Sequence, residues 1–157
     1  CGGGLHFVAD SDIVIASENA TFFDTHVKVG LVAGLEPVGL SRKIPLESVL
    51  RMSLIGGGER LNAEDAKNIG LISEIVKQEN LMTKAIEIAN KIKLHSPSAL
   101  AKTKKAIWQS KEVGLTEALH FAWNLISEQN QHPDFEEGSK AFIEKRLPNW
   151  KSYKSDE

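Results

Sequence analysis

Hydrophobic and polar positions follow two different patterns along this chain, and the change falls near residue 76. Residues 12–16 and 21–23 are short runs of apolar, β-branched or aromatic residues, which are typical of buried strands. Residues 71–76 repeat that pattern and form a third strand candidate. The intervening residues 24–45 are broken by glycine and proline, and they predict an irregular loop with a short helix at 37–43.

Apolar residues recur at intervals of three and four in several later segments, which predicts amphipathic helices. One such helix covers residues 46–55 and stops at three glycines, and another covers residues 81–92. Capping residues, followed by an acidic residue or a proline, mark further helix starts. These predicted starts are Asn62, Ser96, Thr116 and Asp134, and the last helix is expected to run through Arg146.

The two patterns together predict a mixed α/β (α+β) fold with two regions. Residues 1–76 hold the strand candidates, and residues 77–157 form a helical region. The boundary lies at the polar stretch 77–80, where apolar positions are sparse.

Composition narrows the class of protein. The 157 residues carry a net charge of −2, so bulk charge favours neither a nucleic acid nor an anionic membrane as partner. No apolar run approaches the roughly 18 residues of a membrane span. The single cysteine, Cys1, excludes an internal disulfide, and we expect a reducing, cytoplasmic location. Because the chain starts at Cys1 without a methionine, we expect it to be part of a longer polypeptide.

The glycine triplet Gly2, Gly3 and Gly4 is the first candidate for chemistry. Glycine allows a ligand to approach the backbone closely, and free N–H groups at a helix start favour an anion. Residues 7–9 could continue a helix that this glycine turn opens. The triplet is therefore either an anion-binding element or a tight turn without function.

Four segments of the chain resemble the enoyl-CoA hydratase/isomerase (crotonase) family. They are CGGGLHFVADSDIVIASENATFF, VKVGLVAG, GERLNAEDAKNIGLISEIV and FIEKRLPNW, in family order and at family spacing. The resemblance covers essentially the whole chain and corresponds to the later three-fifths of a family domain. It implies a crotonase-like ββα spiral at residues 1–76, followed by a helical trimerisation region at 77–157.

The resemblance also implies an acyl-CoA thioester as substrate, with no separate cofactor. The N–H of Gly3 would be one of two backbone donors to the thioester oxyanion, and the other would come from an upstream segment. Phe142 and Lys145 match positions that contact CoA in relatives, often that of a neighbouring subunit. A homotrimer or a hexamer is the implied assembly.

The chain departs from the family at both acid–base positions. Hydratases carry a glutamate two residues after the third glycine, where this chain has His6, and a second glutamate where it has His26. An imidazole can accept or deliver a proton near neutral pH. We therefore expect His6 and His26 to transfer protons, although they lack the negative charge of two carboxylates.

Two carboxylates lie near these histidines in the sequence. Glu36 stands in an apolar loop beside a proline, where it is a candidate catalytic group or a partner that orients His26. Asp24 precedes His26 by two residues and is a weaker candidate. No spacing of histidines or cysteines indicates a metal site.

The sequence leaves several functions open. The first is an enzyme that forms the enolate of an acyl-CoA thioester and catalyses hydration or double-bond migration, or a diverged hydrolase or decarboxylase step. The second is a non-catalytic, oligomeric CoA-binding protein. The position of the two imidazoles relative to Gly3 distinguishes these readings.

Overall fold

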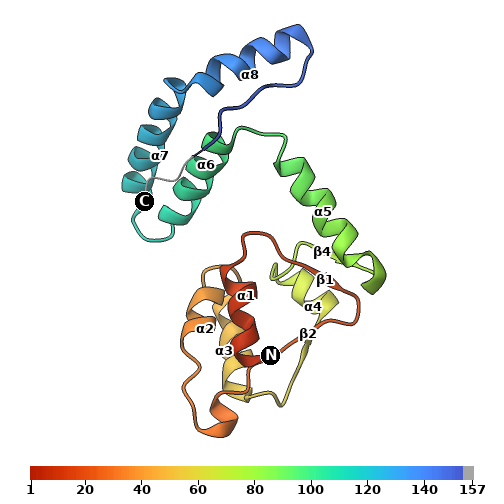
Figure 1. Ribbon diagram of the computed structural model, residues 1–157. Helices are drawn as coiled ribbons and strands as arrows, with labels where there is room; N and C mark the ends of the chain where they lie inside the picture. Colours follow the sequence, from red (N-terminus) through yellow and green to blue (C-terminus); the bar gives the residue numbers. More distant parts are fainter. Residues whose placement is uncertain (154–157) are drawn as a thin grey trace. The chain divides into compact units, whose positions relative to one another are not determined.

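The computed structural model describes residues 1–153, which divide into two compact units (Figure 1). The first unit runs from Cys1 to Glu87, and the second begins at Ile88. This division lies inside helix α5 (Leu81–Ile92), whereas the pattern of apolar residues changes near residue 76. No helix of the described residues has the length and apolar character needed to cross a membrane.

The first unit combines short helices with short strands, as its sequence predicts. In chain order its elements are η1 (Gly2–Gly4), α1 (Leu5–Asp10), β1 (Ile15–Ser17), β2 (Thr21–Phe22), η2 (Val27–Val29), α2 (Leu35–Leu40), α3 (Leu46–Ile55), β3 (Leu61–Asn62), α4 (Ala63–Asn68), β4 (Glu74–Val76) and η3 (Gln78–Asn80). The η elements are 3₁₀ helices.

Within residues 1–153 the strands form two pairs. β1 and β4 are parallel, with Ala16 opposite Ile75, so the segment that connects them contains most of the unit. β2 and β3 are antiparallel, with Phe22 opposite Leu61. The predicted strands at 12–16, 21–23 and 71–76 are confirmed in shorter form, while β3 has too few residues for a periodic signal.

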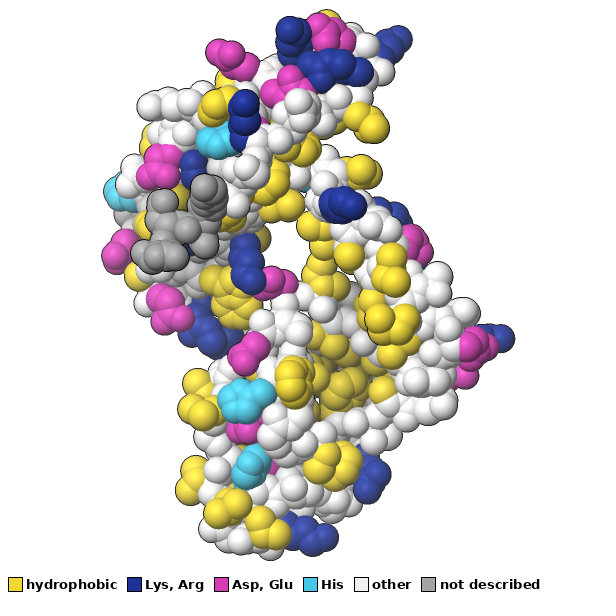
Figure 2. Space-filling model, viewed as in Figure 1, with side chains coloured by type: hydrophobic (Ala, Val, Ile, Leu, Met, Phe, Trp, Pro, Cys, Tyr) yellow, Lys and Arg dark blue, Asp and Glu magenta, His cyan; other side chains and the backbone are white. Residues whose placement is uncertain are grey.

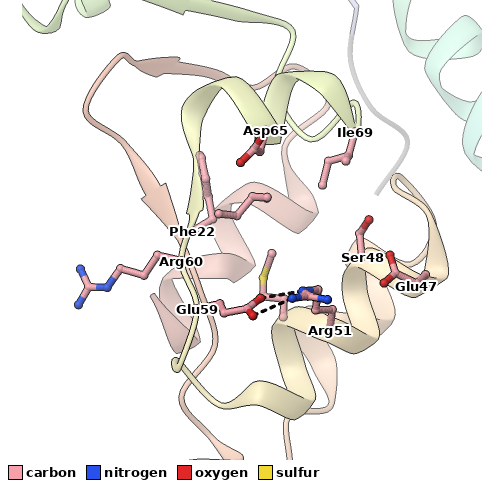
Figure 3. Close-up of a pocket in the computed structure, with 10 residues that line it drawn as sticks. Phe22, Glu47, Ser48, Arg51, Glu59, Arg60, Asp65 and Ile69 are labelled. Atoms are coloured by element: carbon pink, nitrogen blue, oxygen red, sulfur yellow. Dashed lines mark hydrogen bonds and ion pairs between the residues drawn. The ribbon is translucent and has the colours of Figure 1, made fainter.

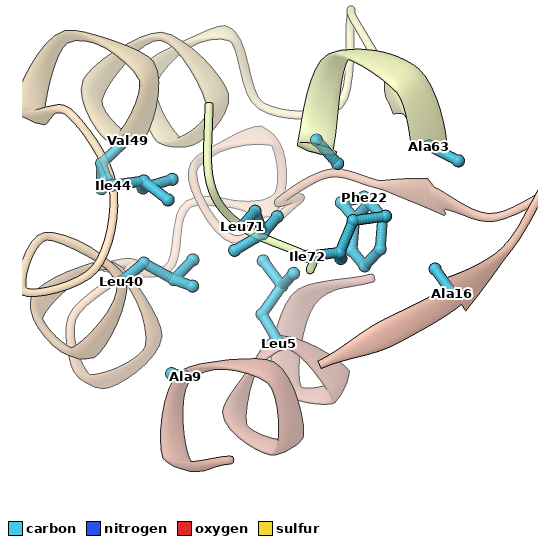
Figure 4. Close-up of a cluster of buried hydrophobic side chains, with 11 residues drawn as sticks. Leu5, Ala9, Ala16, Phe22, Leu40, Ile44, Val49, Ala63, Leu71 and Ile72 are labelled. Atoms are coloured by element: carbon cyan, nitrogen blue, oxygen red, sulfur yellow. The ribbon is translucent and has the colours of Figure 1, made fainter. Parts of the chain in front are cut away.

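Apolar side chains from these elements meet in one core. Leu5 on α1 points toward Leu71 and Ile72, which precede β4, and Phe22 of β2 closes the same cluster (Figure 4). Leu40, at the end of α2, is 1% exposed. Helices α1, α2 and α3 lie side by side around this core (Figure 1), and the glycine triplet directly precedes α1.

Local signals place the boundaries of two helices in this unit. α3 ends at Gly56, whose φ of 64° is left-handed and suits glycine. α4 begins after Asn62, whose side-chain oxygen accepts a hydrogen bond from the Asp65 N–H at 2.8 Å. Both ends agree with the sequence prediction.

The second unit is helical. After the end of α5 it contains α6 (Pro97–Gln109), α7 (Leu115–Asn130) and α8 (Pro133–Glu144). α6 and α7 pack against each other, with Ala118 and Leu125 of α7 buried. Ser96 caps α6 by accepting from the Ala99 N–H, as predicted, whereas α7 starts one residue before the predicted Thr116.

The start and end of the last helix differ from the prediction. His132 is the N-cap and Pro133 the first helical residue, whereas the sequence suggested that Asp134 starts the helix. Asp134 is 3% exposed, and its carboxylate accepts hydrogen bonds from the Ser96 hydroxyl and the Lys151 N–H. Its role is therefore to join separate segments of the unit. The helix ends at Glu144, because Lys145 has a φ of 54°.

Candidate active site

The glycine triplet forms the single 3₁₀ turn η1, which continues directly into α1. Gly2 has a φ of 48°, and its N–H donates to the Phe23 carbonyl at 3.1 Å. Gly3 is exposed, and among the described residues no acceptor is found for its N–H. The first N–H groups of a helix have no partner within it, so this donor can bind an anion.

His26 is held by the carboxylate of Asp24. The ring atom Nδ1 lies 3.0 Å from Oδ1 and 3.1 Å from Oδ2, and the backbone N–H of His26 donates to Oδ1 at 2.8 Å. Asp24 is 0% exposed, while the His26 side chain is 23% exposed. A fully buried aspartate thus fixes an imidazole that still reaches the surface.

The ring of His26 lies beside the glycine triplet. A Cβ atom added to Gly2 would stand 3.8 Å from the His26 Cε1 atom and 3.5 Å from the Thr25 hydroxyl oxygen. The Cε1 atom, which lies between the two ring nitrogens, is therefore near η1. The fold therefore brings His26 to residues that lie more than twenty positions earlier.

His6 pairs with Glu36 across the contact between α1 and α2. Its Nε2 atom lies 3.4 Å from Oε1 of Glu36, and its Nδ1 atom lies 3.7 Å from Oδ2 of Asp10. The Glu36 side chain is 8% exposed and that of His6 is 41% exposed. Glu36 therefore contacts His6 and not His26, for which the sequence analysis had suggested it as a partner. The carboxylate that contacts His26 is that of Asp24.

Figure 2 shows several histidine side chains on the face in view, some of them with an acidic side chain nearby. Neither the imidazole of His6 nor that of His26 is packed inside the apolar core, since both are partly exposed and each contacts a buried carboxylate. Partial exposure is one requirement of a proton-transfer group, because such a group must reach its substrate.

Lys43 anchors the end of α1. Its ammonium group donates to the Val8 carbonyl at 2.9 Å and also to the Ser11 carbonyl. Burial lowers the pKa of Lys43, against the opposing effect of Asp12 and Asp10. The amine therefore joins the helix that carries His6 to the segment after α2.

A separate pocket of about 210 Å³ lies between α3, β3 and α4 (Figure 3). Arg51 and Glu59 form a two-point ion pair in its wall, with both hydrogen bonds at 2.7 Å. The Arg51 hydrogen bond lowers the pKa of Glu59, and the same contact raises that of Arg51. None of the predicted site residues lines this pocket, so it is separate from the histidines.

Phe142 and Lys145 lie at the end of α8, in the second unit. Phe142 is 86% exposed, so it does not pack in a core of the described residues. Lys145 is exposed, and the residue after it, Arg146, forms an ion pair with Glu137 at 2.6 Å. This ion pair holds the turn that follows the helix.

The sequence and the fold of the chain resemble those of known proteins. A family model described as enoyl-CoA hydratase/isomerase matches residues 1–153. The chain belongs to the enoyl-CoA hydratase/isomerase family. The predicted crotonase-like fold is confirmed by a crystal structure of a family member from Mycobacterium paratuberculosis, with a TM-score of 0.92 and 46% identity. That alignment covers 96% of this chain and 60% of the other.

Named family members of known sequence agree with this assignment. The chain is 35% identical over 150 residues to a probable mitochondrial enoyl-CoA hydratase of Dictyostelium discoideum, covering 95% of this chain and 53% of that protein. It is 36% identical over 151 residues to the (E)-benzylidenesuccinyl-CoA hydratase of Thauera aromatica, covering 94% and 57%. The chain thus spans little more than half the length of these relatives.

Asp24 contacts His26 in the structure, and the sequence analysis gave it as a weaker candidate than Glu36. Its spacing of two residues from His26 was visible, but an aspartate in a loop is ordinarily a turn residue. Its complete burial, which depends on the surrounding helices and strands, separates it from such residues.

Proposed function

We propose that this chain carries the proton-transfer part of an enzyme that acts on an acyl-CoA thioester through its enolate. The Gly3 N–H would stabilise the enolate oxygen, and His6 and His26 would transfer protons, with Glu36 beside His6. The observation that carries the proposal is that the imidazoles of His6 and His26 are both partly exposed and each contacts a buried carboxylate. The sequence resemblance implies that hydratases carry glutamates at these two positions. No separate cofactor takes part in this scheme.

Hydration of an enoyl thioester is the reaction we favour. One imidazole would take a proton from a water molecule while the oxygen of that water adds to C3. The other imidazole would deliver a proton to C2. Two relatives of this chain are named as hydratases, one of them with an aromatic acyl group, and this supports the reaction class. The panel of enoyl-CoA esters in the assay below identifies the acyl group that the protein accepts.

A turnover assay on the complete natural protein tests the proposal. Loss of the enoyl absorbance of crotonyl-CoA and of a panel of longer and aromatic enoyl-CoA esters would be followed. We expect His6→Gln and His26→Gln each to lower kcat by roughly 10²-fold or more. The matched control is His120→Gln on α7, an exposed histidine outside the first unit, which should leave kcat unchanged.

Proton exchange separates enolate formation from hydration. A saturated acyl-CoA ester incubated in deuterated water should lose its C2 proton at a rate that depends on His26 or His6. If exchange occurs without hydration, the reaction is another enolate-dependent step, such as double-bond migration. If the protein binds CoA esters but catalyses neither process, the non-catalytic CoA-binding function replaces the proposal.

The remaining roles belong to the same proposal. Phe142 and Lys145 would contact the CoA moiety, and the exposure of Phe142 leaves it available for this. The helical region, residues 77–157, would assemble the chain into a homotrimer or a hexamer, which light scattering would reveal. A cytoplasmic location is also proposed, and some relatives are named as mitochondrial.

A further inference from the structure

The carboxylate of Asp24 has few ways to satisfy its charge. It is 0% exposed, so water does not solvate it. The hydrogen bonds found for it within residues 1–153 all come from His26: the backbone N–H bonds to Oδ1, and the ring Nδ1 contacts both carboxylate oxygens. A buried carboxylate without enough donors is costly, and the ring contact therefore matters for its charged form.

This contact determines which ring nitrogen carries the proton. Nδ1 lies 3.0 and 3.1 Å from the two carboxylate oxygens. An unprotonated Nδ1 would direct its lone pair at two negatively charged acceptors, whereas a protonated Nδ1 donates to them. The neutral ring of His26 therefore has its proton on Nδ1, and Nε2 has a free lone pair.

His6 provides an internal contrast. Both of its ring nitrogens have a carboxylate oxygen within reach, at 3.7 Å for Asp10 and 3.4 Å for Glu36. These contacts are longer than those at His26, and they favour neither tautomer strongly. The two histidines are consequently not equivalent.

We infer that Asp24 is a positioning residue that keeps His26 in the Nδ1–H tautomer, so that Nε2 of His26 is the base of the site. This inference rests on the proposed function. In C2 proton exchange, or in the reverse of hydration, Nε2 takes a proton from C2 of the thioester. The C–H electron pair then moves into the enolate, and the ring becomes an imidazolium beside the Asp24 carboxylate. The carboxylate stays ionised and stabilises the new charge.

Ring-nitrogen NMR of the complete protein, labelled with ¹⁵N, tests the assignment without turnover. Spectra recorded over a pH series show where the ring is neutral, and there the tautomer can be read from the two nitrogen shifts. We expect a protonated Nδ1 and an unprotonated Nε2 for His26, and Asp24→Asn should shift this pattern. The control Glu18→Gln, an exposed carboxylate in the turn after β1, should not. A wild-type spectrum with an unprotonated Nδ1 overturns the inference.

Kinetics of Asp24→Asn provide the second readout. We expect kcat to fall by roughly 10²-fold, because part of the ring population has the wrong tautomer, while KM changes less than about twofold. A raised KM with unchanged kcat would instead indicate a structural role and would overturn the inference. If the variant does not fold, the wild-type spectrum alone decides the tautomer. Full turnover by His26→Gln would reject the proposed function and with it the role of Nε2, and the spectrum would still report the tautomer.

Discussion

The Nε2 atom of His6 lies 3.4 Å from Oε1 of Glu36, although thirty positions separate the two residues in the chain. The packing of α1 against α2 produces this pair. Glu36 is buried while His6 is partly exposed, so the carboxylate lies on the buried side of the imidazole and the opposite side faces solvent. The pair suggests the first of four predictions.

Glu36→Gln should lower kcat while the fold is retained. The substitution preserves the shape of the side chain and removes the negative charge beside His6. Because His6 is 41% exposed, solvent weakens the interaction, and we expect a loss on the order of tenfold, or ~1.4 kcal/mol of barrier. The measurement is kcat on the best substrate of the enoyl-CoA panel.

The control for Glu36→Gln is Glu47→Gln. Glu47 is also in the first turn of its helix, α3, but it is exposed. It should leave kcat within about twofold of the wild type. Equal losses in both variants would mean that Glu36 acts only as a helix-end charge.

Gly2→Ala should destabilise the first unit through its backbone. The added Cβ would find ordinary contacts, at 3.5 Å or more, but Gly2 has a φ of 48°. A left-handed conformation costs a non-glycine residue about 1–2 kcal/mol. Urea unfolding followed by circular dichroism measures the change. Gly3→Ala, where no atom lies within 4 Å, is the control and should cost clearly less; similar losses in both would contradict the argument.

The Glu137–Arg146 pair should make stability depend on acid pH. Hydrogen bonds from Arg146 and from the Asn149 N–H lower the pKa of Glu137 from 4.5 to about 2. A lowered pKa means that the folded state favours the ionised form. The contribution is therefore complete above pH 4.5 and is lost as the pH falls from about 4.5 to about 2.

Glu137→Gln should consequently destabilise the protein at neutral pH and lose this effect in acid. Urea unfolding at several pH values would show the wild type and the variant converging below about pH 4.5. Glu136→Gln, the exposed neighbour in α8, should show no such convergence. A difference that is independent of pH would exclude the ion pair as its cause.

Leu40→Ala should be the most destabilising of these changes. Leu40 is 1% exposed in the core around α2, and removal of a buried leucine leaves a cavity that costs about 2–5 kcal/mol. Leu35 begins the same helix but is 75% exposed, so Leu35→Ala should change stability by about 0.5 kcal/mol or less. Chemical unfolding of both variants tests the contrast. Equal losses of stability in the two variants would show that helix propensity, and not burial, determines the effect of the substitution.

Local chemistry made much of the secondary structure predictable. Residues 46–55 and 81–92 are helical as their spacing predicts, and Asn62 and Ser96 cap helices as expected. These features depend on side chains within four residues of each other, so the sequence contains the information. The predicted helix at 37–43 instead lies at 35–40. The last helix starts one residue before Asp134, because His132 caps it by accepting a hydrogen bond from the Asp134 N–H and Pro133 is in its first turn.

The order of the family segments, by itself, determined the fold class and the positions of His6, His26 and Gly3 as site candidates. Only the tertiary structure decided which carboxylate accompanies which histidine. Glu36 reaches His6 because α2 packs on α1, and Asp24 holds His26 because the surrounding elements exclude water from it. The Glu36–His6 pair and the burial of Asp24 depend on contacts between segments far apart in the chain, and a sequence pattern with a local range does not record them.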